Sequence, residues 1–363
     1  MADNPIAAAV RDALKSVEIP GGNNLADYEG LSEVIVTPSA VAFAISVEPG
    51  MDGAFGPVQA AASQAAQAVS EGRKVMVSLT ADRAPSGAGK AGGAPQQQAP
   101  GPQKSPVKGI RNIIAVASGK GGVGKSTCAV NLALALKNQG LRVGVLDADL
   151  YGPSIPKLLG LEGKPAVRED GMFVAFEAFG LKAISIGSML EKNQPVVWRG
   201  PMASSALRQL LRETHWGDLD VLVIDLPPGT GDIQISLCQQ VELAGAVIVS
   251  TPQDLALIDA QKAMNMFLRL KIPVLGMIEN MSYFVAPDTG ARYDIFGHGG
   301  ARNVAKELGL PFLGEVPLHM NIREQSDAGA PIVASDPDSE EAKAFTSIVS
   351  ALVEQNAELQ TAG

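Results

Sequence analysis

The sequence predicts an α/β protein: a doubly wound, mostly parallel sheet preceded by a small αββαβ domain. Short β-branched apolar runs alternate with stretches of helical period along most of the 363 residues. One segment rich in Pro, Gly, Ala and Gln interrupts this pattern and divides the chain. Hydrophobic residues make up 46% and charged residues 18% of the chain, so there is enough apolar side chain for a sizeable core.

The interrupting segment sets the expected domain boundaries. Residues 84–106 contain five Pro, five Gly, five Ala and four Gln, and no large apolar side chain. Such a segment buries too little surface to offset the entropy cost of ordering it. We therefore expect a flexible linker over residues 84–108, between a domain of residues 1–83 and a domain of residues 109–363.

The first domain is expected to contain two helices and three strands. Apolar residues at helical spacing, from Ile6 to Val17, predict the first helix, and Pro20 with the two glycines after it ends that helix. The other elements are a hairpin turning at Pro38-Ser39, an Ala-rich helix and a last strand, at residues 33–37, 41–47, 58–69 and 75–79. This part has no Cys, no His and no evident catalytic cluster, which favours a docking or scaffold role.

The second domain carries the pattern of a doubly wound fold. Apolar strands are predicted at residues 113–117, 143–146, 221–224, 246–250 and 274–278, with helical stretches between most of them. Such strands are typical of a parallel sheet covered on both faces, whose ligands bind at the carboxyl ends of the strands. A last helix over residues 340–354 is expected to pack on the outside.

A glycine-rich loop follows the first of these strands and precedes a helix. Residues 118–127 read Ser-Gly-Lys-Gly-Gly-Val-Gly-Lys-Ser-Thr, which satisfies G-x-x-x-x-G-K-[ST] in the context that a phosphate-binding loop requires. In such a loop the backbone N–H groups turn inward around phosphate oxygens, Lys125 reaches the β and γ phosphates, and Ser126 coordinates Mg²⁺. The predicted nucleotide-binding residues of the loop are Gly119, Lys120, Gly121, Gly122, Val123, Gly124, Lys125, Ser126 and Thr127.

Two aspartates complete the predicted site. Asp225 ends an apolar strand, as a Walker B carboxylate that holds Mg²⁺ through water does. The residues after it, Leu226-Pro227-Pro228-Gly229, lack the adjacent catalytic Glu of many motor ATPases. Asp149, at the end of the second strand, is the best placed candidate for activating water. We expect slow hydrolysis, which suits a switch better than a motor.

The nucleotide is predicted to be ATP. The sequence contains no Asn-Lys-x-Asp, the guanine signature, which favours ATP over GTP. Asn280 stands just past the strand expected to end at Ile278 and is a candidate reader of adenine. A turn-stabilising role for this Asn is the alternative.

Composition excludes several classes of protein. A net charge of −9 argues against a general binder of nucleic acid or anionic membranes, although it leaves room for a local basic patch. Two cysteines rule out a disulfide framework and a Cys-rich zinc module. The sequence has no basic segment leading into an apolar run at its N-terminus and no uninterrupted apolar run of roughly 18 residues. We expect a soluble, cytoplasmic protein with no nucleic-acid or membrane partner.

Further residues resemble a known family. Lys120, directly after the first Gly of the loop, gives a motif that resembles the deviant Walker A of the MinD, ParA and nitrogenase iron-protein superfamily. Four other stretches look like those of the Mrp/ApbC iron-sulfur cluster carrier ATPases, at residues 147–154, 198–202, 225–232 and 295–300. They read Asp-Ala-Asp-Leu-Tyr-Gly-Pro-Ser, Trp-Arg-Gly-Pro-Met, Asp-Leu-Pro-Pro-Gly-Thr-Gly-Asp and Ile-Phe-Gly-His-Gly-Gly. The first domain resembles the small iron-sulfur assembly domain often fused to these proteins.

The resemblance implies a mechanism and partners. It implies a homodimer that sandwiches ATP, in which Lys120 reaches the nucleotide of the opposite subunit and acts in catalysis with Lys125 and Asp149. Asp149 then belongs to the first switch region, and residues 225–232 form the Walker B strand end and the second switch. The family's adenine contact falls on Asn280. The implied partners are apoprotein clients or iron-sulfur assembly proteins.

One position departs from the family. Carriers usually have a Cys-x-x-Cys after Asn-Met-Ser-Tyr, where thiolates from two subunits bridge one cluster, but here the residues are Ala286-Pro287-Asp288-Thr289. Cys128 and Cys238 stand in apolar helical stretches and are expected to be buried. His298 is either a metal ligand near the missing pair or a structural residue. A subunit-bridging iron-sulfur cluster would therefore lack its usual ligands here.

Two functions stay open on the sequence alone. The first is an ATP-hydrolysing iron-sulfur cluster carrier or assembly factor that helps to transfer clusters to apoproteins. The second is a cluster-free, nucleotide-switched adaptor or a positioning ATPase of the MinD/ParA type. Residues 357–363 lack the basic amphipathic helix of a membrane-cycling relative. Arg199 and Arg208 are interpreted as surface residues or as nucleotide-responsive dimer contacts, and His215 and His319 as structural.

Overall fold

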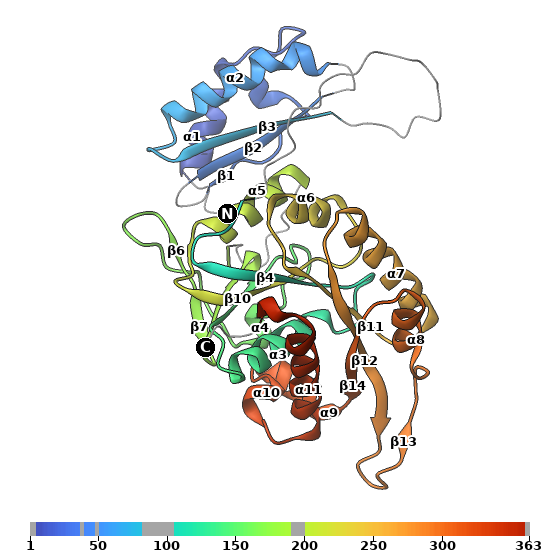
Figure 1. Ribbon diagram of the computed structural model, residues 1–363. Coiled ribbons are helices and arrows are strands. Elements are labelled where there is room, and N and C mark those ends of the chain that lie inside the picture. Colours follow the sequence, from blue (N-terminus) through green and yellow to red (C-terminus); the bar gives the residue numbers. More distant parts are fainter. Residues whose placement is uncertain (1–4, 37–39, 48–50, 82–104, 190–199, 360–363) are drawn as a thin grey trace, which may run out of the picture. The chain divides into compact units, whose positions relative to one another are not determined.

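The computed structural model describes residues 5–36, 40–47, 51–81, 105–189 and 200–359 (Figure 1). The chain divides into two compact units, one formed mainly by residues 1–101 and the other by residues 102–197 and 203–363. Most of the expected linker, residues 84–104, lies outside the described residues. The linker boundaries at residues 84 and 108 stay a prediction.

The first unit has the predicted αββαβ order. Its elements are α1 (Pro5–Ala13), a 3₁₀ turn (Leu14–Ser16), β1 (Ile35–Val36), β2 (Ala40–Val47), α2 (Asp52–Ala68) and β3 (Lys74–Ala81). Strand β2 lies in the middle of the sheet, antiparallel to β1 and parallel to β3. Phe43 and Ile45 of β2 are fully buried in one cluster with Val10 and Leu14. The turn predicted at Pro38-Ser39 lies outside the described residues.

The second unit contains a nine-stranded sheet among the residues that the structure describes. Its order is β13-β12-β11-β4-β10-β5-β8-β7, and β14 pairs with β12 outside this path. The short strands β7 and β13 are antiparallel to their neighbours, and the other pairings are parallel. The strands are β4 (Ile110–Ala117), β5 (Val143–Asp147), β7 (Phe176–Ala178), β8 (Leu181–Ser185), β10 (Leu219–Asp225), β11 (Gly245–Ser250), β12 (Val274–Val285), β13 (Arg292–Tyr293) and β14 (Phe312–Leu318), with β6 (Phe173–Val174) and β9 (Thr214–His215) paired separately.

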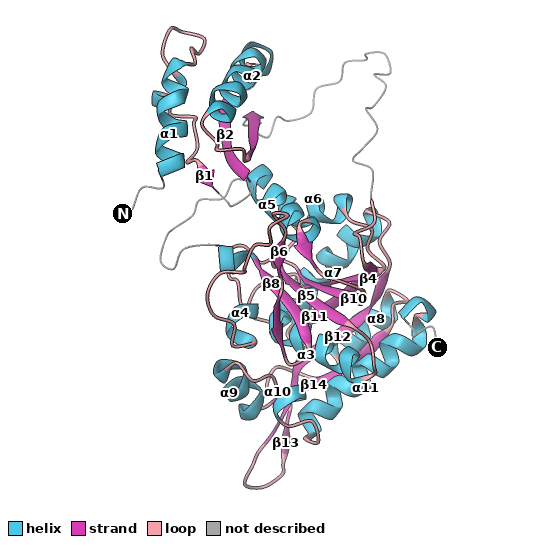
Figure 2. Cartoon of the chain, turned by 90° about the vertical axis from the view of Figure 1, so that its left-hand side faces the viewer, coloured by secondary structure: helices cyan, strands magenta, loops and turns pink. Residues whose placement is uncertain are grey.

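Helices cover both faces of this sheet. Helices α3 and α11 pack on one face, and α7 and α8 on the other (Figure 2). The doubly wound, mostly parallel fold that the sequence predicts is therefore confirmed. The helices are α3 (Lys125–Asn138), α4 (Ile155–Leu158), α5 (Gly200–Arg212), α6 (Asp232–Gln240), α7 (Asp254–Arg269), α8 (Gly300–Glu307), α9 (Met320–Ala328), α10 (Ile332–Ser335) and α11 (Glu340–Gln355).

Strand composition explains the layering and the position of the site. Strands β5, β10 and β11 are buried along their whole length, because helices cover the sheet on both sides. The parallel register aligns Asp225 of β10 with Asp147 of β5 on one side and Val116 of β4 on the other. The carboxyl ends of the three central strands therefore meet at one edge of the sheet, where the glycine-rich loop also lies.

One strand is longer than predicted. The sequence places its end at Ile278, whereas β12 continues to Val285. Met281 has a φ of 55°, and the register with β14 shifts between Asn280 and Phe284. The strand thus bends at Met281 and continues into a hairpin with β13.

The last helix, α11, has clear sequence determinants. The Ser339 hydroxyl accepts a hydrogen bond from the Ala342 N–H at 3.2 Å, and Glu340 and Glu341 stand in the first turn. Phe345 and Leu352 bury the opposite face against the core. Among the described residues, no helix has the length and apolar character needed to span a membrane.

Candidate functional site

The glycine-rich loop of residues 118–127 joins β4 to α3 as a cradle of unpaired N–H groups. Gly124 has a φ of 80°, in the left-handed region that favours glycine. Gly119 packs so closely on α7 that a Cβ there would lie 2.0 Å from the carbonyl carbon of Asp259. Within the described residues, the backbone N–H groups of residues 124–127 donate no hydrogen bond. They are therefore available to an anionic ligand at the start of α3.

A cavity of about 710 Å³ opens beside this loop. This volume lies in the range of pockets that hold small molecules and cofactors. The cavity brings together the loop, the segment after β5, the middle of β12, the end of β14 and one side of α9. Besides the loop, its lining includes Asp149, Lys157, Pro228, Asn280, His319 and Arg323.

Lys125 lies at the base of the cavity and is held by acidic groups. Its side chain is 6% exposed, and its Nζ donates a hydrogen bond to Asp225 Oδ1. Asp149 Oδ2 lies 4.0 Å from the same Nζ, and the Ser126 Oγ lies 3.4 Å from it. The structure therefore brings together the four side chains that the sequence assigned to catalysis and Mg²⁺ binding within one subunit.

The carboxyl group of Asp225 has the properties of a cation ligand. Asp225 is fully buried, and its Oδ2 has no hydrogen-bond partner within the described part of the chain. Burial raises the pKa of Asp225, and the Lys125 ammonium opposes this rise. An unpartnered carboxylate oxygen next to a hydroxyl and beside a phosphate cradle fits Mg²⁺, which prefers oxygen ligands.

Asp147 organises the loop that carries Asp149. It is fully buried and accepts hydrogen bonds from the N–H groups of Asp149 and Ile155, both at 3.1 Å, and from the Ser185 hydroxyl at 2.8 Å. Burial raises the pKa of Asp147 to about 7, and the neighbouring Asp225 carboxylate adds to this rise. Asp149 Oδ1 accepts a hydrogen bond from the Gly152 N–H at 3.2 Å, so the candidate base sits in a fixed turn.

The segment after Asp225 is tied to the glycine-rich loop. The Gly229 N–H donates to the Ser118 carbonyl oxygen at 2.9 Å. Gln234, only 3% exposed on α6, donates from its Nε2 to the carbonyl oxygens of Pro227 and Gly229. Residues 225–232, the predicted second switch, therefore have a defined position beside the cradle.

Lys120 presents a free ammonium group at the cavity. Its carbonyl oxygen accepts a hydrogen bond from the Ser118 hydroxyl at 2.9 Å, which holds the backbone of the loop. Its Nζ has no hydrogen-bond or ion-pair partner among the described residues of this one subunit. This geometry leaves the side chain available to a second molecule. Contact between Lys120 and the nucleotide of a second subunit stays a prediction.

Asn280 lies in the cavity wall, inside β12 rather than in a turn. Asn280 itself is therefore not part of a turn, and the choice between a structural role and an adenine contact stays open. The residue is 7% exposed, and its Nδ2 donates a hydrogen bond to the Val123 carbonyl oxygen at 2.8 Å. Contact with adenine stays a prediction for the same side chain.

The two cysteines are buried, as the sequence predicts. Cys128, on α3, is 1% exposed, and Cys238, on α6, is fully buried. Burial raises the pKa of the Cys128 thiol to about 12, and the Asp225 charge adds to the rise. Residues 287–289, part of the stretch where the family resemblance predicts a Cys pair, are exposed at the tip of the β12–β13 hairpin. Neither cysteine is presented to a cluster at that tip.

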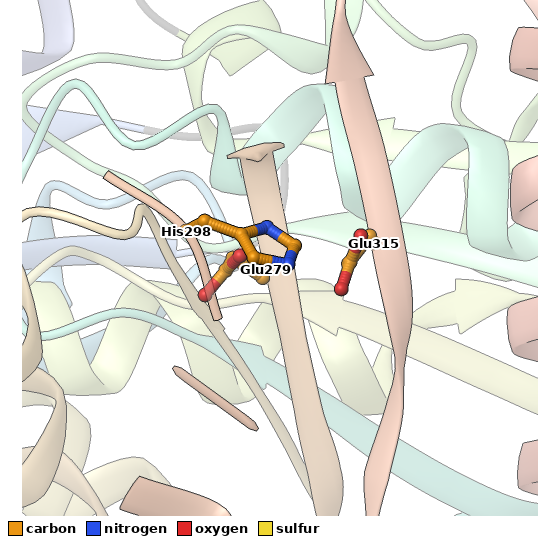
Figure 3. Close-up of side chains that lie close together, drawn as sticks. All are labelled: Glu279, His298 and Glu315. Carbon is orange, nitrogen blue, oxygen red and sulfur yellow. The ribbon is translucent and has the colours of Figure 1, made fainter. Parts of the chain in front are cut away.

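The imidazole of His298 lies close to two carboxylates. Figure 3 shows Glu279, His298 and Glu315 close together, with one ligand atom of each within 4.8 Å of the others. Glu279 is fully buried and accepts hydrogen bonds from the N–H groups of Gly299 and Ala301, at 3.2 and 2.7 Å. Glu279 thereby caps the first turn of α8.

Arginines occupy the space around the rest of this group. Arg292 Nη2 lies 2.9 Å from His298 Nδ1, and Arg302 Nη2 lies 3.0 Å from Glu315 Oε1. Arg292 also lies 3.7 Å from Glu315 and stacks over the Tyr283 ring. Two arginines thus pair with Glu315, and Glu279 is occupied by backbone N–H groups, so the contacts support the structural interpretation of His298 over a metal site.

Arg208 and His319 make contacts within the chain, and Arg199 cannot be placed. Arg208 donates from its Nε to Gln240 Oε1 at 2.8 Å, on the neighbouring helix of the same chain. His319 caps α9, because its Nδ1 accepts from the Asn321 N–H at 3.2 Å. Arg199 lies outside the described residues.

Sequence reasoning missed three polar residues that shape the site. Gln234, Ser185 and Asp147 are buried and bind the loops that carry the predicted groups. Asp147 carried a weak signal, because it precedes Asp149 in a motif that the sequence analysis quoted. Gln234 and Ser185 had none, since Gln234 bonds to backbone carbonyl oxygens of a loop and Ser185 bonds to Asp147 from a separate strand.

Comparison with known proteins agrees with this geometry. A sequence model described as ParA: NUBPL iron-transfer P-loop NTPase matches residues 109–353. The chain is 51% identical over 266 residues to the iron-sulfur cluster transfer protein NUBPL of Dictyostelium discoideum, covering 73% of this chain and 82% of the relative. It is 55% identical over 248 residues to the iron-sulfur cluster carrier protein of Aquifex aeolicus, covering 68% of each chain.

A solved structure shares the fold. A nucleotide-binding protein of Archaeoglobus fulgidus in complex with ADP superposes with a TM-score of 0.57 at 40% sequence identity, covering 65% of this chain and 92% of that protein. The family model spans more than half of the present chain, including the cradle, Asp149, Asp225 and Asn280. From its fold, its site and this match, the chain belongs to the NUBPL iron-transfer P-loop NTPase family.

Proposed function

We propose that this protein binds ATP with Mg²⁺, hydrolyses it slowly, and uses the cycle to help transfer iron-sulfur clusters to apoproteins. The observation that carries the ATP part is the group formed by Lys125, Asp225 and Asp149 at the base of a cavity lined by the glycine-rich loop. The names of two relatives, an iron-sulfur cluster transfer protein and an iron-sulfur cluster carrier protein, support iron-sulfur clusters as the cargo.

Residues of the cradle bind the phosphates. The N–H groups of residues 124–127 and the Lys125 ammonium hold the phosphate oxygens, so Lys125 exchanges its contact with Asp225 for one with the nucleotide. Ser126 and Asp225 hold Mg²⁺, which neutralises phosphate charge when it is bound. The remaining contacts come from residues 119–123 and, for adenine, from Asn280.

Asp149 activates the attacking water. In hydrolysis an oxygen–phosphorus bond forms between water and the γ phosphorus, and the bond from the γ phosphorus to the bridging oxygen of ADP breaks. The water proton passes to a carboxylate oxygen of Asp149 and from there to solvent. No Glu follows Asp225, so this single, tethered carboxylate makes turnover slow.

The active form is a homodimer. The Lys120 ammonium of one subunit, which has no partner among the described residues of its own chain, binds the phosphates in the other subunit and stabilises the charge of the transition state. Sedimentation velocity with and without Mg-ATP tests this: nucleotide should convert monomer to dimer. A sedimentation coefficient that ATP leaves unchanged would contradict the dimer.

The thiolates for a cluster come from a partner or a client. Iron-sulfur clusters are held by cysteine thiolates, and both cysteines of this chain are buried, one with a pKa of about 12. This observation also favours a second candidate function: a nucleotide-switched adaptor that carries no cluster of its own and assists a protein that does.

Anaerobic reconstitution with iron and sulfide tests whether this chain itself supplies the ligands of a cluster. We expect the wild-type chain to retain no cluster by absorbance or iron counting while it still binds ATP. The matched variant Ala286→Cys/Thr289→Cys restores the spacing at the hairpin tip and should retain iron. Equal iron in both proteins would show that the chain has other ligands and would overturn the assignment of the thiolates to a partner.

We also propose the domain arrangement and compartment that the sequence predicts. Residues 1–83 form a docking domain, residues 84–108 a flexible linker and residues 109–363 the ATPase, in a cytoplasmic protein without nucleic-acid or membrane partners. Limited proteolysis should cut first between residues 84 and 108. An initial cut inside residues 109–353 would contradict the boundaries, and membrane association on cell fractionation would contradict the compartment.

A further inference from the structure

Asn280 makes a hydrogen bond to the phosphate loop that an adenine contact does not require. Its Nδ2 lies 2.8 Å from the Val123 carbonyl oxygen, and both groups are removed from solvent. A carbonyl oxygen only accepts, so the amide nitrogen of Asn280 must face it. The bond therefore fixes the orientation of the side-chain amide and of the peptide that it binds.

This bond controls the next N–H of the loop. A trans peptide is planar, so its C=O and N–H point in opposite directions. With the Val123 carbonyl directed at Asn280, the Gly124 N–H is directed to the other side of that peptide. Gly124 N–H has no partner within the described residues, as a group reserved for a phosphate oxygen should.

The geometry around Gly124 leaves no room for another arrangement. A Cβ at this position would lie 2.1 Å from Asn280 Nδ2, and the φ of Gly124 is 80°. Only glycine allows both the close approach and the left-handed backbone. Gly124 thus adopts the left-handed backbone conformation, and Asn280 holds the preceding peptide in place.

Strand β12 gives Asn280 a rigid base. In β12, Glu279 pairs with Ser250 of β11, and Asn280 pairs with Val316 of β14. The bend at Met281 begins only after these pairs. The amide therefore reaches the loop from the sheet rather than from a surface turn.

We propose that Asn280 is a positioning residue for the phosphate cradle: it holds the Val123–Gly124 peptide so that the Gly124 N–H faces the bound phosphates. This role rests on the proposed ATP site and goes beyond the predicted contact with adenine. It makes Asn280 important for any polyphosphate, including one that has no base.

Binding of Mg-tripolyphosphate, which lacks a base, separates the two roles. By isothermal titration calorimetry we expect Asn280→Ala to raise the Kd for tripolyphosphate about tenfold, which corresponds to about 1.4 kcal/mol. Asn280→Asp should raise it more, because it places a carboxylate oxygen against the Val123 carbonyl. The Kd values for ATP and GTP should rise by at least the same factor.

A second asparagine provides the matched control. Asn112, on β4, donates from its Nδ2 to the Glu358 carbonyl oxygen at 2.8 Å, away from the cavity. Asn112→Ala loses the same kind of bond and should leave tripolyphosphate binding unchanged. Circular dichroism and thermal unfolding of each variant establish that it is folded, and the near-isosteric Asn280→Asp serves if Asn280→Ala does not fold.

Each outcome bears on the proposal. Unchanged tripolyphosphate binding in a folded Asn280 variant, with lost preference for ATP over GTP, would overturn the positioning role and leave an adenine contact alone. Wild-type protein that binds neither tripolyphosphate nor ATP would overturn the proposed ATP site, and the positioning role with it. A rise in Kd for tripolyphosphate in the Asn280 variants, absent in Asn112→Ala, supports the proposal.

Discussion

The side-chain amide of Gln234 donates a hydrogen bond to the Gly229 carbonyl oxygen, with 2.8 Å between Nε2 and oxygen. The same nitrogen donates to the Pro227 carbonyl oxygen at 2.6 Å, and the Gly229 N–H donates to Ser118. One buried side chain on α6 therefore holds the segment after Asp225, and the backbone of that segment bonds to the phosphate loop.

Gln234→Glu should slow hydrolysis more than it weakens binding. The substitution replaces both donors by an acceptor that faces two carbonyl oxygens, so the segment loses its fixed position. We expect kcat to fall about tenfold, the effect of about 1.4 kcal/mol on the barrier, with a smaller change in the Kd for ATP. Gln240→Glu, the same change on the same helix at a residue outside the site, is the control. Equal kcat values for the two variants would contradict the role of Gln234.

Lys125→Ala should abolish ATP hydrolysis. The variant removes the ammonium that lies beside Asp225 and Asp149 at the base of the cavity, so phosphate charge loses its main compensation. Phosphate release should fall at least about 100-fold. Lys137→Ala, at the other end of α3, should hydrolyse ATP like the wild type. Retained turnover in Lys125→Ala refutes the assignment of the loop.

Lys120→Ala should weaken dimerisation in the presence of Mg-ATP while leaving the fold intact. The lysine has no partner among the described residues of its own subunit, so its removal breaks no contact there. Sedimentation velocity should show less dimer, and turnover should fall. Lys306→Ala, an exposed lysine on α8, is the control. If dimer fraction and turnover both match the control, the role across the subunits is wrong.

Asp220→Asn should destabilise the second unit, and the effect should fade at low pH. Hydrogen bonds from Arg142 hold the pKa of Asp220 at about 2, below its ordinary value of 3.8. The carboxylate therefore stabilises the fold at every pH above about 4, and this stabilisation is lost as pH falls toward 2. The side chain is 12% exposed, so the loss at pH 7 should be roughly 2 kcal/mol.

Urea unfolding followed by tryptophan fluorescence at pH 7 and pH 3 measures this difference. Asp218→Asn is the control, since its side chain is 82% exposed and lies 4.0 Å from Arg142. That variant should unfold within about 0.5 kcal/mol of the wild type. A penalty for Asp220→Asn that stays constant between pH 7 and pH 3 would contradict the ion pair as its source.

Native protein should react slowly with thiol reagents at pH 8. Both cysteines are buried, and the Cys128 thiol stays protonated because burial raises its pKa to about 12. We expect no fast-reacting thiol in the native wild type and two after unfolding in urea. Ala286→Cys/Thr289→Cys should add two fast thiols. A fast thiol in the native wild type would remove the argument against cluster ligation by this chain.

The fold was predictable where an apolar stretch of the sequence forms a fully buried strand. Strands such as β10 are apolar on both faces, and their alternation with helices indicates a covered parallel sheet. Strand β14 was missed because Gly314 and Pro317 interrupt its pattern. Its position at an edge explains this composition, since an edge strand tolerates Pro.

The site was predictable in its phosphate loop and acidic groups but not in its supports. The loop carries a local motif, so Lys125 and Ser126 can be assigned from spacing alone. The bond from Asn280 to Val123 and the bonds from Gln234 join distant or irregular segments, and backbone acceptors leave no trace in a sequence. The missing part is therefore the set of contacts that hold the motif in place.

The bend at Met281 separates the hairpin tip from the sheet. Beyond it, β12 and β13 form a hairpin that projects from the sheet, with residues 286–290 half-buried or exposed (Figure 1). Substitution at the tip removes no packing from the core, so cysteines can be introduced at residues 286 and 289 at little cost in folding free energy. Ligands at the hairpin tip can thus change independently of the sheet that carries the phosphate loop.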